Sequence, residues 1–204
     1  MSESPSLSPS GWLDRLYLPL GKRLLDLLIG GAGVLVLGLV IVPVTLAILF
    51  DSRGPVFFVQ MRTGLHERPF RMLKFRTMKW PPVLENSTKP SAGGDTRLTR
   101  MGRLLRRASL DELPQFLHVL SGEMSFIGPR PELMSRLALY TAPDRERARV
   151  KPGMSGWWQV HGRPQPMQEH AHLDLYYIQH ISFWLDMQIL LRTFMAVLRG
   201  TGAL

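Results

Sequence analysis

The chain of 204 residues contains no cysteine. This absence excludes disulfide bonds, thiolate-zinc sites and a cysteine nucleophile, and it fits a reducing compartment. Acidic residues are scarce, because 16 aspartates and glutamates stand against 25 lysines and arginines and give a formal net charge of +9. Such a charge favours a polyanionic partner, which can be nucleic acid, an anionic membrane surface or a phosphorylated substrate. No internal repeat is evident, and the length suggests one domain, or one domain plus an anchor.

A long apolar segment narrows these classes. From Leu27 to Phe50 the sequence LLIGGAGVLVLGLVIVPVTLAILF carries no charge, and an apolar run of more than about 18 residues is typical of a membrane segment. A buried core helix is the alternative. A cleaved signal peptide fits less well, because the run is too long and no small-residue cleavage pattern closes it.

Basic residues flank this segment on both sides. By the positive-inside rule both of its ends then belong on the cytoplasmic side, which a re-entrant helix satisfies better than a spanning one. Pro43 could break the helix inside the bilayer, although proline is also tolerated in spanning helices. We therefore predict a re-entrant helix, with a spanning helix as the alternative. The flanking residues are Lys22 and Arg23 before the segment and Arg53, Arg62, Arg68 and Arg71 after it.

The rest of the chain predicts a mainly α fold with a small β-hairpin, hence α+β. The β-rich runs GPVFFVQMRTG and RPFRMLKFRTM are separated by a polar turn at His66 to Pro69, which indicates the hairpin. Arg100, Arg103 and Arg107 recur at helical spacing beside leucines, which predicts a basic amphipathic helix suited to an anionic interface. A second amphipathic segment, ISFWLDMQILLRTFMAVLRG, follows near the C-terminus. We divide the chain into a disordered or juxtamembrane part (1–21), the membrane helix (22–50) and a catalytic domain (51–204), with a loop at 81–95.

An acidic pair, Asp111 and Glu112, lies in the stretch ASLDELPQ. Ser109 and Glu112 have the spacing of a helix capping box, which is the ordinary interpretation of such a pair. Pro114 argues against it, because proline removes an amide donor and biases the preceding residue away from the α region. The alternative places the pair on an irregular turn, with the helix proper beginning near Pro114.

The order of the motifs is more specific than any one of them. Between Lys22 and Gly200 the chain resembles the bacterial sugar transferase family, the monotopic polyprenyl-phosphate phosphoglycosyl transferases, in a form with only the minimal catalytic part. One departure is that family members bend the membrane helix at a Ser-Pro pair, whereas Val42 precedes Pro43 here. The motifs that carry the resemblance are KRLLD, GPVFFVQ, FRMLKFRTM, SLDELPQFLHVLSGEMSFIGPRPE, KPGMSGWWQVHGR and DLYYIQHISFWLD.

The resemblance implies an enzyme at the cytoplasmic face of the bacterial inner membrane. It would transfer a sugar phosphate from a nucleotide diphosphate sugar, usually a UDP-sugar, to undecaprenyl phosphate and release the nucleoside monophosphate. Asp111 would be the nucleophile that forms a covalent phosphosugar intermediate, and Glu112 would support it. The pair would also hold Mg²⁺, while Arg106 and Arg130 match arginines of the family's phosphate site.

Five further residues are candidates for substrate binding. Alternation along a strand places Lys74 and Arg76 on one face, where they could reach one anion together, although an exposed basic edge is equally expected. Pro129 and Pro131 bracket Arg130 and stiffen its backbone, and the planar guanidinium suits phosphate. Asp174 matches an acidic position of the family and could orient a cation or an arginine.

Other classes remain as rivals. A membrane-tethered nucleic-acid-binding module fits the charge but lacks a recognisable binding motif, so we expect no nucleic-acid partner. A non-catalytic scaffold of a glycan pathway and a glycosyltransferase that releases a nucleoside diphosphate are the others. The histidines of EHAH (169–172) are expected to be surface or core residues rather than metal ligands. The sugar, the nucleobase and the oligomeric state stay open, a homodimer included.

Overall fold

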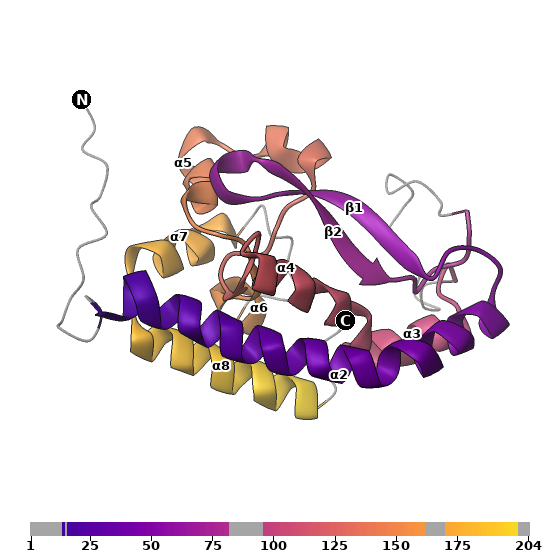
Figure 1. Cartoon of the computed structure of the whole chain (residues 1–204). Helices are drawn as coiled ribbons and strands as arrows, with labels where there is room; N and C mark the ends of the chain where they lie inside the picture. The colour runs from indigo at the N-terminus through magenta and orange to yellow at the C-terminus, as the bar shows by residue number, and fades with distance from the viewer. Residues whose placement is uncertain (1–13, 15, 82–95, 162–169, 200–204) are drawn as a thin grey trace.

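The computed structural model describes residues 14, 16–81, 96–161 and 170–199 and confirms the α+β fold, with most of the described chain helical (Figure 1). The predicted loop at 81–95 lies, apart from Pro81, outside these residues, as do residues 1–13. The elements are η1 (Tyr17–Gly21), α2 (Lys22–Asp51), β1 (Phe57–Thr63), η2 (Leu65–Glu67), β2 (Pro69–Phe75), α3 (Arg100–Arg107), η3 (Leu110–Gln115), α4 (Phe116–Ser121), β3 (Ser125–Ile127), η4 (Met134–Leu139), α5 (Ala142–Arg145), η5 (Glu146–Arg149), β4 (Gly153–Ser155), α6 (Trp157–His161), α7 (Ala171–Gln179) and α8 (Phe183–Leu198).

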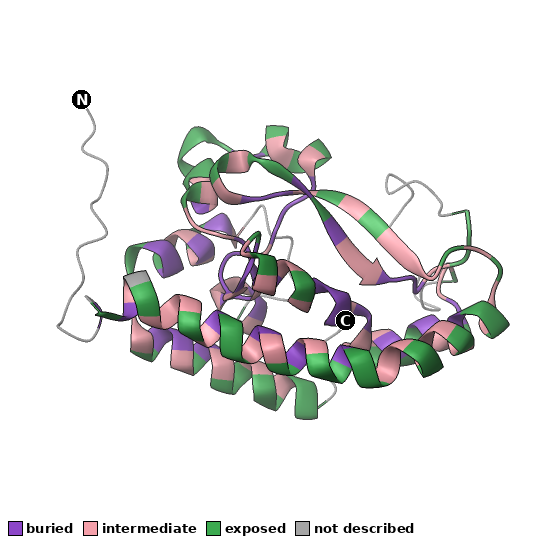
Figure 2. Ribbon diagram, viewed as in Figure 1, coloured by how far each residue is buried: buried purple, intermediate pink, exposed green. Residues whose placement is uncertain are grey.

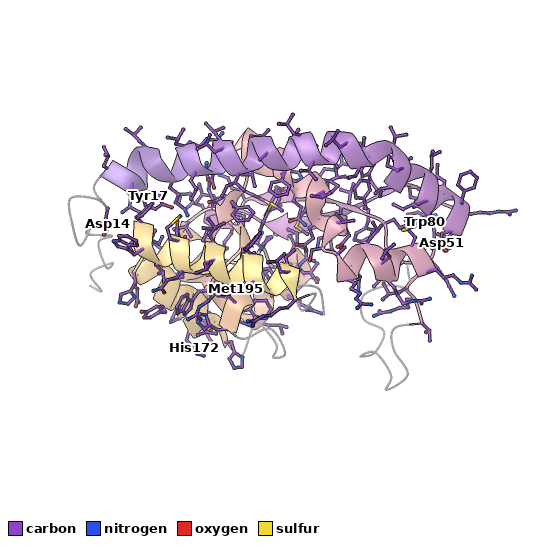
Figure 3. The ribbon with its side chains drawn as sticks, turned by 90° about the horizontal axis from the view of Figure 1, so that it is seen from below. Asp14, Tyr17, Asp51, Trp80, His172 and Met195 are labelled. Atoms are coloured by element: carbon purple, nitrogen blue, oxygen red, sulfur yellow. The ribbon has the colours of Figure 1, made fainter. Side chains whose placement is uncertain are left out.

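The apolar segment forms one continuous helix, α2, with Pro43 in its interior. The expected helix break at Pro43 is therefore wrong. Figures 1 and 3 show the helix changing direction once along its length, as a proline that removes one backbone hydrogen bond can cause. Leu37 and Ile48, on either side of Pro43, are buried in one core with Phe75 and Leu105. Because the domain packs against both halves of α2, the helix continues through the proline.

The two faces of α2 have different surroundings. Within its most apolar window only 17% of the residues are buried, whereas the core helix of a soluble protein would be mostly covered. Exposed residues recur along the outer side of α2 and of the neighbouring α8 (Figure 2). A helix of this length and composition, uncovered on its apolar side, fits membrane association. The exposed apolar residues of α2 include Leu24, Leu28, Leu35, Leu39, Val42, Leu46 and Phe50, and those of α8 include Trp184, Leu191, Phe194 and Leu198.

The N-terminal end of α2 is fixed to the domain by polar contacts. Lys22 Nζ donates to Asp186 Oδ2 at 2.6 Å and to the carbonyl oxygen of Ile127 at 3.0 Å. Tyr17, in the turn η1, donates to the same Asp186 oxygen at 2.5 Å, and Asp14 accepts from the backbone N–H of Phe183 at 3.1 Å. Tyr17–Gly21, which we assigned to the juxtamembrane part, thus form η1, and these contacts bind this segment to α8.

Further contacts hold α2 along its length. The Arg23 guanidinium donates to the carbonyl oxygens of Val119 and Leu120, each at 2.8 Å, and Asp26 accepts from the backbone N–H of Phe126 at 2.7 Å. At the other end of the helix (Figure 3), Asp51 accepts from the backbone N–H of Met101 at 2.8 Å. A carboxylate in that place satisfies a free amide in the first turn of α3. Helix α2 is therefore part of the fold of the domain that follows it.

The hairpin prediction is confirmed. Strands β1 and β2 pair antiparallel over seven residues, from Phe57 opposite Phe75 to Thr63 opposite Pro69. His66 and Glu67, in the connecting turn, have positive φ angles of 52° and 60°. The inner side of β2 packs on η3, which carries the acidic pair, and Phe70 and Met72 enter a core with Val119. The hairpin therefore delivers the β2 side chains to the acidic pair.

Membrane association can be tested on the exposed stripe of α2. Leu39 is 80% exposed, and we expect Leu39→Glu to weaken binding to membranes without unfolding the domain. A charge within the hydrocarbon region costs about 2.5–3.5 kcal/mol at the centre of a helix. Liposome flotation measures the effect. Leu139→Glu is the matched control, because Leu139 is 69% exposed on η4; equal loss of binding in both variants would contradict the assignment.

Candidate active site

The acidic pair lies on the 3₁₀-helix η3, directly after α3. Ser109 has a φ of 55°, in the left-handed region, and its side chain makes no capping hydrogen bond. The capping-box interpretation is therefore wrong. The alternative prediction, in which the pair precedes the α-helix proper, is confirmed. Pro114 lies within the 3₁₀-helix η3, and the α-helix α4 begins two residues later, at Phe116. The positive φ of Ser109 turns the chain sharply after α3. The acidic pair therefore comes only a few residues after Arg106 and Arg107, in the last turn of that helix.

Asp111 is the buried member of the pair, with 8% of its surface exposed. Burial and then the neighbouring Glu112 carboxylate raise the pKa of Asp111 above its ordinary value, while Lys74 and Arg106 oppose that rise. A buried carboxylate surrounded by few waters is a better nucleophile than a hydrated one, provided that positive groups keep it ionised. Lys74 and Arg106 supply this charge.

Glu112 links two basic side chains from different parts of the chain. Its Oε1 lies 2.6 Å from Lys74 Nζ, on β2, and 3.6 Å from Arg130 Nη2. Burial lowers the pKa of the Lys74 ammonium below its ordinary value, and Glu112 offsets part of that lowering. Lys74, Glu112 and Arg130 also line one pocket, together with Arg62, Met72, Gln115, Pro131 and Gly153. Four of the predicted residues, Lys74, Glu112, Arg130 and Pro131, thus meet in one place.

Arg106 approaches the pair from the last turn of α3. Its Nε donates to Thr77 Oγ1 at 3.1 Å, and its charge acts on Asp111. The sequence did not single out Thr77, which orients this guanidinium. Basic groups therefore reach the pair from β2, from α3 and from the segment that follows β3, an arrangement suited to a substrate with several negative charges.

The segment Pro129–Pro131 is held through its backbone. The carbonyl oxygen of Pro129 accepts from the N–H of Gly153 at 2.8 Å, and that of Pro131 accepts from Arg62 Nη1 at 3.2 Å. Between them, the carbonyl oxygen of Arg130 accepts from Arg147 Nη2 at 2.7 Å. Three consecutive carbonyls bound by three different elements fix the position from which the Arg130 side chain extends.

Asp174 acts on this segment through an arginine. Its Oδ2 pairs with Arg147 Nη2 at 2.6 Å, and both side chains are buried. Burial raises the pKa of Asp174, and Arg147 opposes that rise. Arg147 Nη1 also donates to Tyr140, whose hydroxyl donates to Glu132 Oε2 at 2.7 Å. Of the two roles considered for Asp174, the structure has it orient an arginine, and that arginine holds the backbone of Arg130.

The Arg76 side chain does not lie beside Lys74 at the acidic pair, where we predicted it. Arg76 follows β2, is 3% exposed, and donates to the carbonyl oxygens of Ser52, at 2.7 Å, and Arg53. These carbonyls lie just beyond the end of α2. The expectation that Lys74 and Arg76 reach one anion together is wrong, because the Arg76 guanidinium is occupied with the backbone at the C-terminal end of the membrane helix.

The residues present are compatible with Mg²⁺, which commonly takes one or two protein carboxylates and completes its shell with water and substrate phosphates. Asp111 and Glu112 supply adjacent carboxylates of that kind. Within the described ranges no group of three His, Cys, Asp or Glu residues could hold a metal alone. Of the EHAH stretch, Glu169 is outside the described residues, and the rings of His170 and His172 are 5.6 Å apart.

The sequence signalled some of these residues and missed others. Arg147 comes from the charged run DRERAR and Arg62 from a strand, and neither position has a neighbour that distinguishes it. Gln115 lies three residues after Glu112 and directly after Pro114. Its closeness to the acidic pair is the sequence feature from which its place in the site could have been predicted. Thr77 lies in the FRTM stretch, directly after Arg76, which was named for its charge.

Helix α2 is built into the domain with an uncovered apolar side, and basic side chains surround the acidic pair. These features fit a membrane-associated protein, and the basic groups suit a substrate with negative charge. The family model described as bacterial sugar transferase matches residues 17–200. The chain belongs to this family and is an enzyme of the phosphoglycosyl transferase class.

Individual relatives agree with this assignment. The uncharacterized sugar transferase EpsL of Bacillus subtilis (strain 168) is 44% identical over 165 residues, which are 80% of each chain. A UDP-glucose:undecaprenyl-phosphate glucose-1-phosphate transferase of Caulobacter vibrioides is 38% identical over 97% of this chain and 77% of its own length. A UDP-N-acetylgalactosamine-undecaprenyl-phosphate N-acetylgalactosaminephosphotransferase of Aeromonas hydrophila is 38% identical over 89% of this chain but 44% of its own length.

Proposed function

We propose that this enzyme transfers a sugar 1-phosphate from a UDP-sugar to undecaprenyl phosphate and releases UMP, through a covalent intermediate on Asp111. The observation that carries the proposal is the position of Asp111, which is buried beside Glu112 and within reach of the charges of Lys74 and Arg106. The names of the relatives from Caulobacter vibrioides and Aeromonas hydrophila support the donor and acceptor classes.

In the first step a carboxylate oxygen of Asp111 attacks the phosphorus that bears the sugar. A bond forms between that oxygen and phosphorus, and the bond from this phosphorus to the bridging oxygen of the diphosphate breaks. The bridging oxygen leaves with its electron pair as part of UMP. Arg106, Lys74 and Arg130 bind the phosphate oxygens and stabilise the charge that moves onto the leaving group.

In the second step an oxygen of undecaprenyl phosphate attacks the same phosphorus. The bond to Asp111 breaks, the carboxylate is regenerated, and the product is a sugar joined to the lipid through a diphosphate. Asp111 and Glu112 would hold Mg²⁺, which would neutralise part of the negative charge of the lipid phosphate and of the phosphoryl group that it attacks. Glu112 also keeps Lys74 and Arg130 at the site through its ion pairs.

The membrane helix explains how a water-insoluble acceptor reaches the site. Undecaprenyl phosphate keeps its phosphate at the headgroup level, so the catalytic pair has to lie at that depth. The packing of α2 along the domain, through Leu37 and Ile48, fixes the distance between the helix and η3. We place the enzyme at the cytoplasmic face of the bacterial inner membrane, where the basic flanks of α2 favour it.

Product analysis tests the reaction. The protein in nanodiscs is given Mg²⁺, undecaprenyl phosphate and a panel of UDP-sugars, with UMP and UDP assayed separately. We expect UMP, released in amounts beyond one per enzyme only when the lipid phosphate is present. Omitting Mg²⁺ and adding a chelator should stop turnover. Release of UDP would instead mean glycosyl transfer and would remove the role given to Asp111.

A further inference from the structure

Gln115, the last residue of η3, has a buried side chain with an unused donor. It is 3% exposed, and its amide nitrogen Nε2 has no hydrogen-bond partner among the described residues. Buried polar groups are nearly always hydrogen-bonded in folded proteins, so an unpaired one calls for an explanation, and a ligand, ion or water that binds from outside the chain is one. The fold alone does not explain a polar residue at this position.

Gln115 lines a pocket beside the acidic pair. Residues three apart in a 3₁₀-helix lie on the same side, so Gln115 is aligned with Glu112 one turn earlier. Both line the pocket that Lys74 and Arg130 also line. The other polar side chains of this pocket are charged, and Glu112 already pairs with Lys74 and Arg130. The amide of Gln115 is thus a neutral donor in a pocket whose other polar side chains are charged.

We infer that the Gln115 amide donates a hydrogen bond to a phosphoryl oxygen of the donor substrate, on the phosphorus that Asp111 attacks. This inference rests on the proposed function. Gln115 and Asp111 belong to the same short helix, so the donor and the nucleophile are held in a fixed relation to each other. A fixed neutral donor stabilises charge that develops on a phosphoryl oxygen without binding the ground-state diphosphate as tightly as a cation would.

The effect on stability separates this role from a structural one. Methionine has nearly the shape of glutamine and no donor, so Gln115→Met removes an unsatisfied buried group and should leave the unfolding temperature unchanged or higher. A glutamine that serves the fold behaves in the opposite way. Gln159 is the matched control, since it is 4% exposed and its Nε2 donates to the carbonyl oxygen of Met154 at 2.7 Å. Gln159→Met should therefore lower the unfolding temperature.

The experiment measures kcat, KM and thermal unfolding of the full chain in nanodiscs, with a UDP-sugar that the wild-type enzyme accepts. For Gln115→Met we expect kcat to fall about 10²-fold and KM to rise by no more than about threefold to tenfold, as for the loss of one donor that acts mostly in the transition state. A kcat within about twofold of wild type would overturn the inference. So would a fall in kcat accompanied by the same loss of unfolding temperature as Gln159→Met.

A second readout does not depend on turnover. Inorganic pyrophosphate, titrated calorimetrically into the full chain in the presence of Mg²⁺, probes the phosphate contact directly. We expect Gln115→Met to bind it about threefold to tenfold more weakly than wild type, and equal affinities would count against the contact. If wild type releases no UMP but its pyrophosphate affinity depends on Gln115, the proposed function fails and the phosphate contact stands.

Discussion

Replacing Asp111 with asparagine should lower the rate of UMP release by about 10³-fold or more, because the variant loses the nucleophile rather than a supporting contact. Asparagine has nearly the same shape and is uncharged, so it should fit the buried site without the charge repulsion that Glu112 exerts on Asp111. The folded structure should therefore survive the change. Steady-state UMP release, with thermal unfolding measured on the same samples, checks both statements.

The covalent step has its own measurement. Wild-type enzyme incubated with donor but no lipid phosphate should gain the mass of one sugar phosphate in intact-protein mass spectrometry, and Asp111→Asn should gain none. The matched control is Asp144→Asn, because Asp144 is a half-buried residue of α5 that accepts hydrogen bonds from Thr141. An adduct of unchanged yield in Asp111→Asn, or its location on another residue, would refute the assignment of the nucleophile.

The elements predicted correctly are those encoded locally. Alternating residues and a polar turn suffice for the β1–β2 hairpin, and arginines at helical spacing suffice for α3. Pro114 alone indicated that the acidic pair does not begin an ordinary α-helix. In each case the pattern lies within one continuous stretch of the chain, and tertiary packing reinforces it.

The errors arise where distant parts of the chain decide the outcome. Pro43 does not break α2, because the domain packs on both sides of it through Leu37 and Ile48. Arg76 was expected at the phosphate site, but carbonyls beyond the end of α2, more than twenty residues earlier, take its guanidinium. A sequence pattern shows that such a residue is charged and on which face of the strand its side chain lies. It does not show which hydrogen-bond acceptor from a distant part of the chain will lie beside it in the folded protein.

The sequence also does not reveal the network behind Arg130. Its members come from η5, α7 and the segment after β3, and they meet only in the folded chain. The PRP motif correctly indicated a stiff backbone. The hydrogen bond from Arg147 adds a stronger constraint, since it holds the Arg130 carbonyl to a residue that is itself fixed by Asp174.

Breaking the buried pair between Asp174 and Arg147 should cost about 3–5 kcal/mol of unfolding free energy, because it leaves a buried charge without its counter-charge. Asp174→Asn preserves the shape of the side chain and isolates this effect. The matched control is Glu146→Gln, which removes the ion pair of Glu146 with Arg149 at 2.8 Å. That pair is solvent-exposed, so its loss should cost less than about 1 kcal/mol. Denaturant unfolding measures both, and similar costs for the two variants would contradict the prediction.

A double replacement separates the stabilising role of the pair from its positioning role. Asp174→Leu combined with Arg147→Met removes both charges together, and apolar replacement of a buried ion pair is commonly neutral or stabilising. We expect this variant to regain most of the stability that Asp174→Asn loses. Its kcat should nevertheless remain about tenfold or more below wild type. The carbonyl oxygen of Arg130 has then lost the hydrogen bond from Arg147, so the backbone that carries the Arg130 side chain is no longer held in place. Recovery of stability together with full kcat would show that the pair serves the fold alone, whereas stability without activity identifies Asp174 and Arg147 as positioning residues for Arg130.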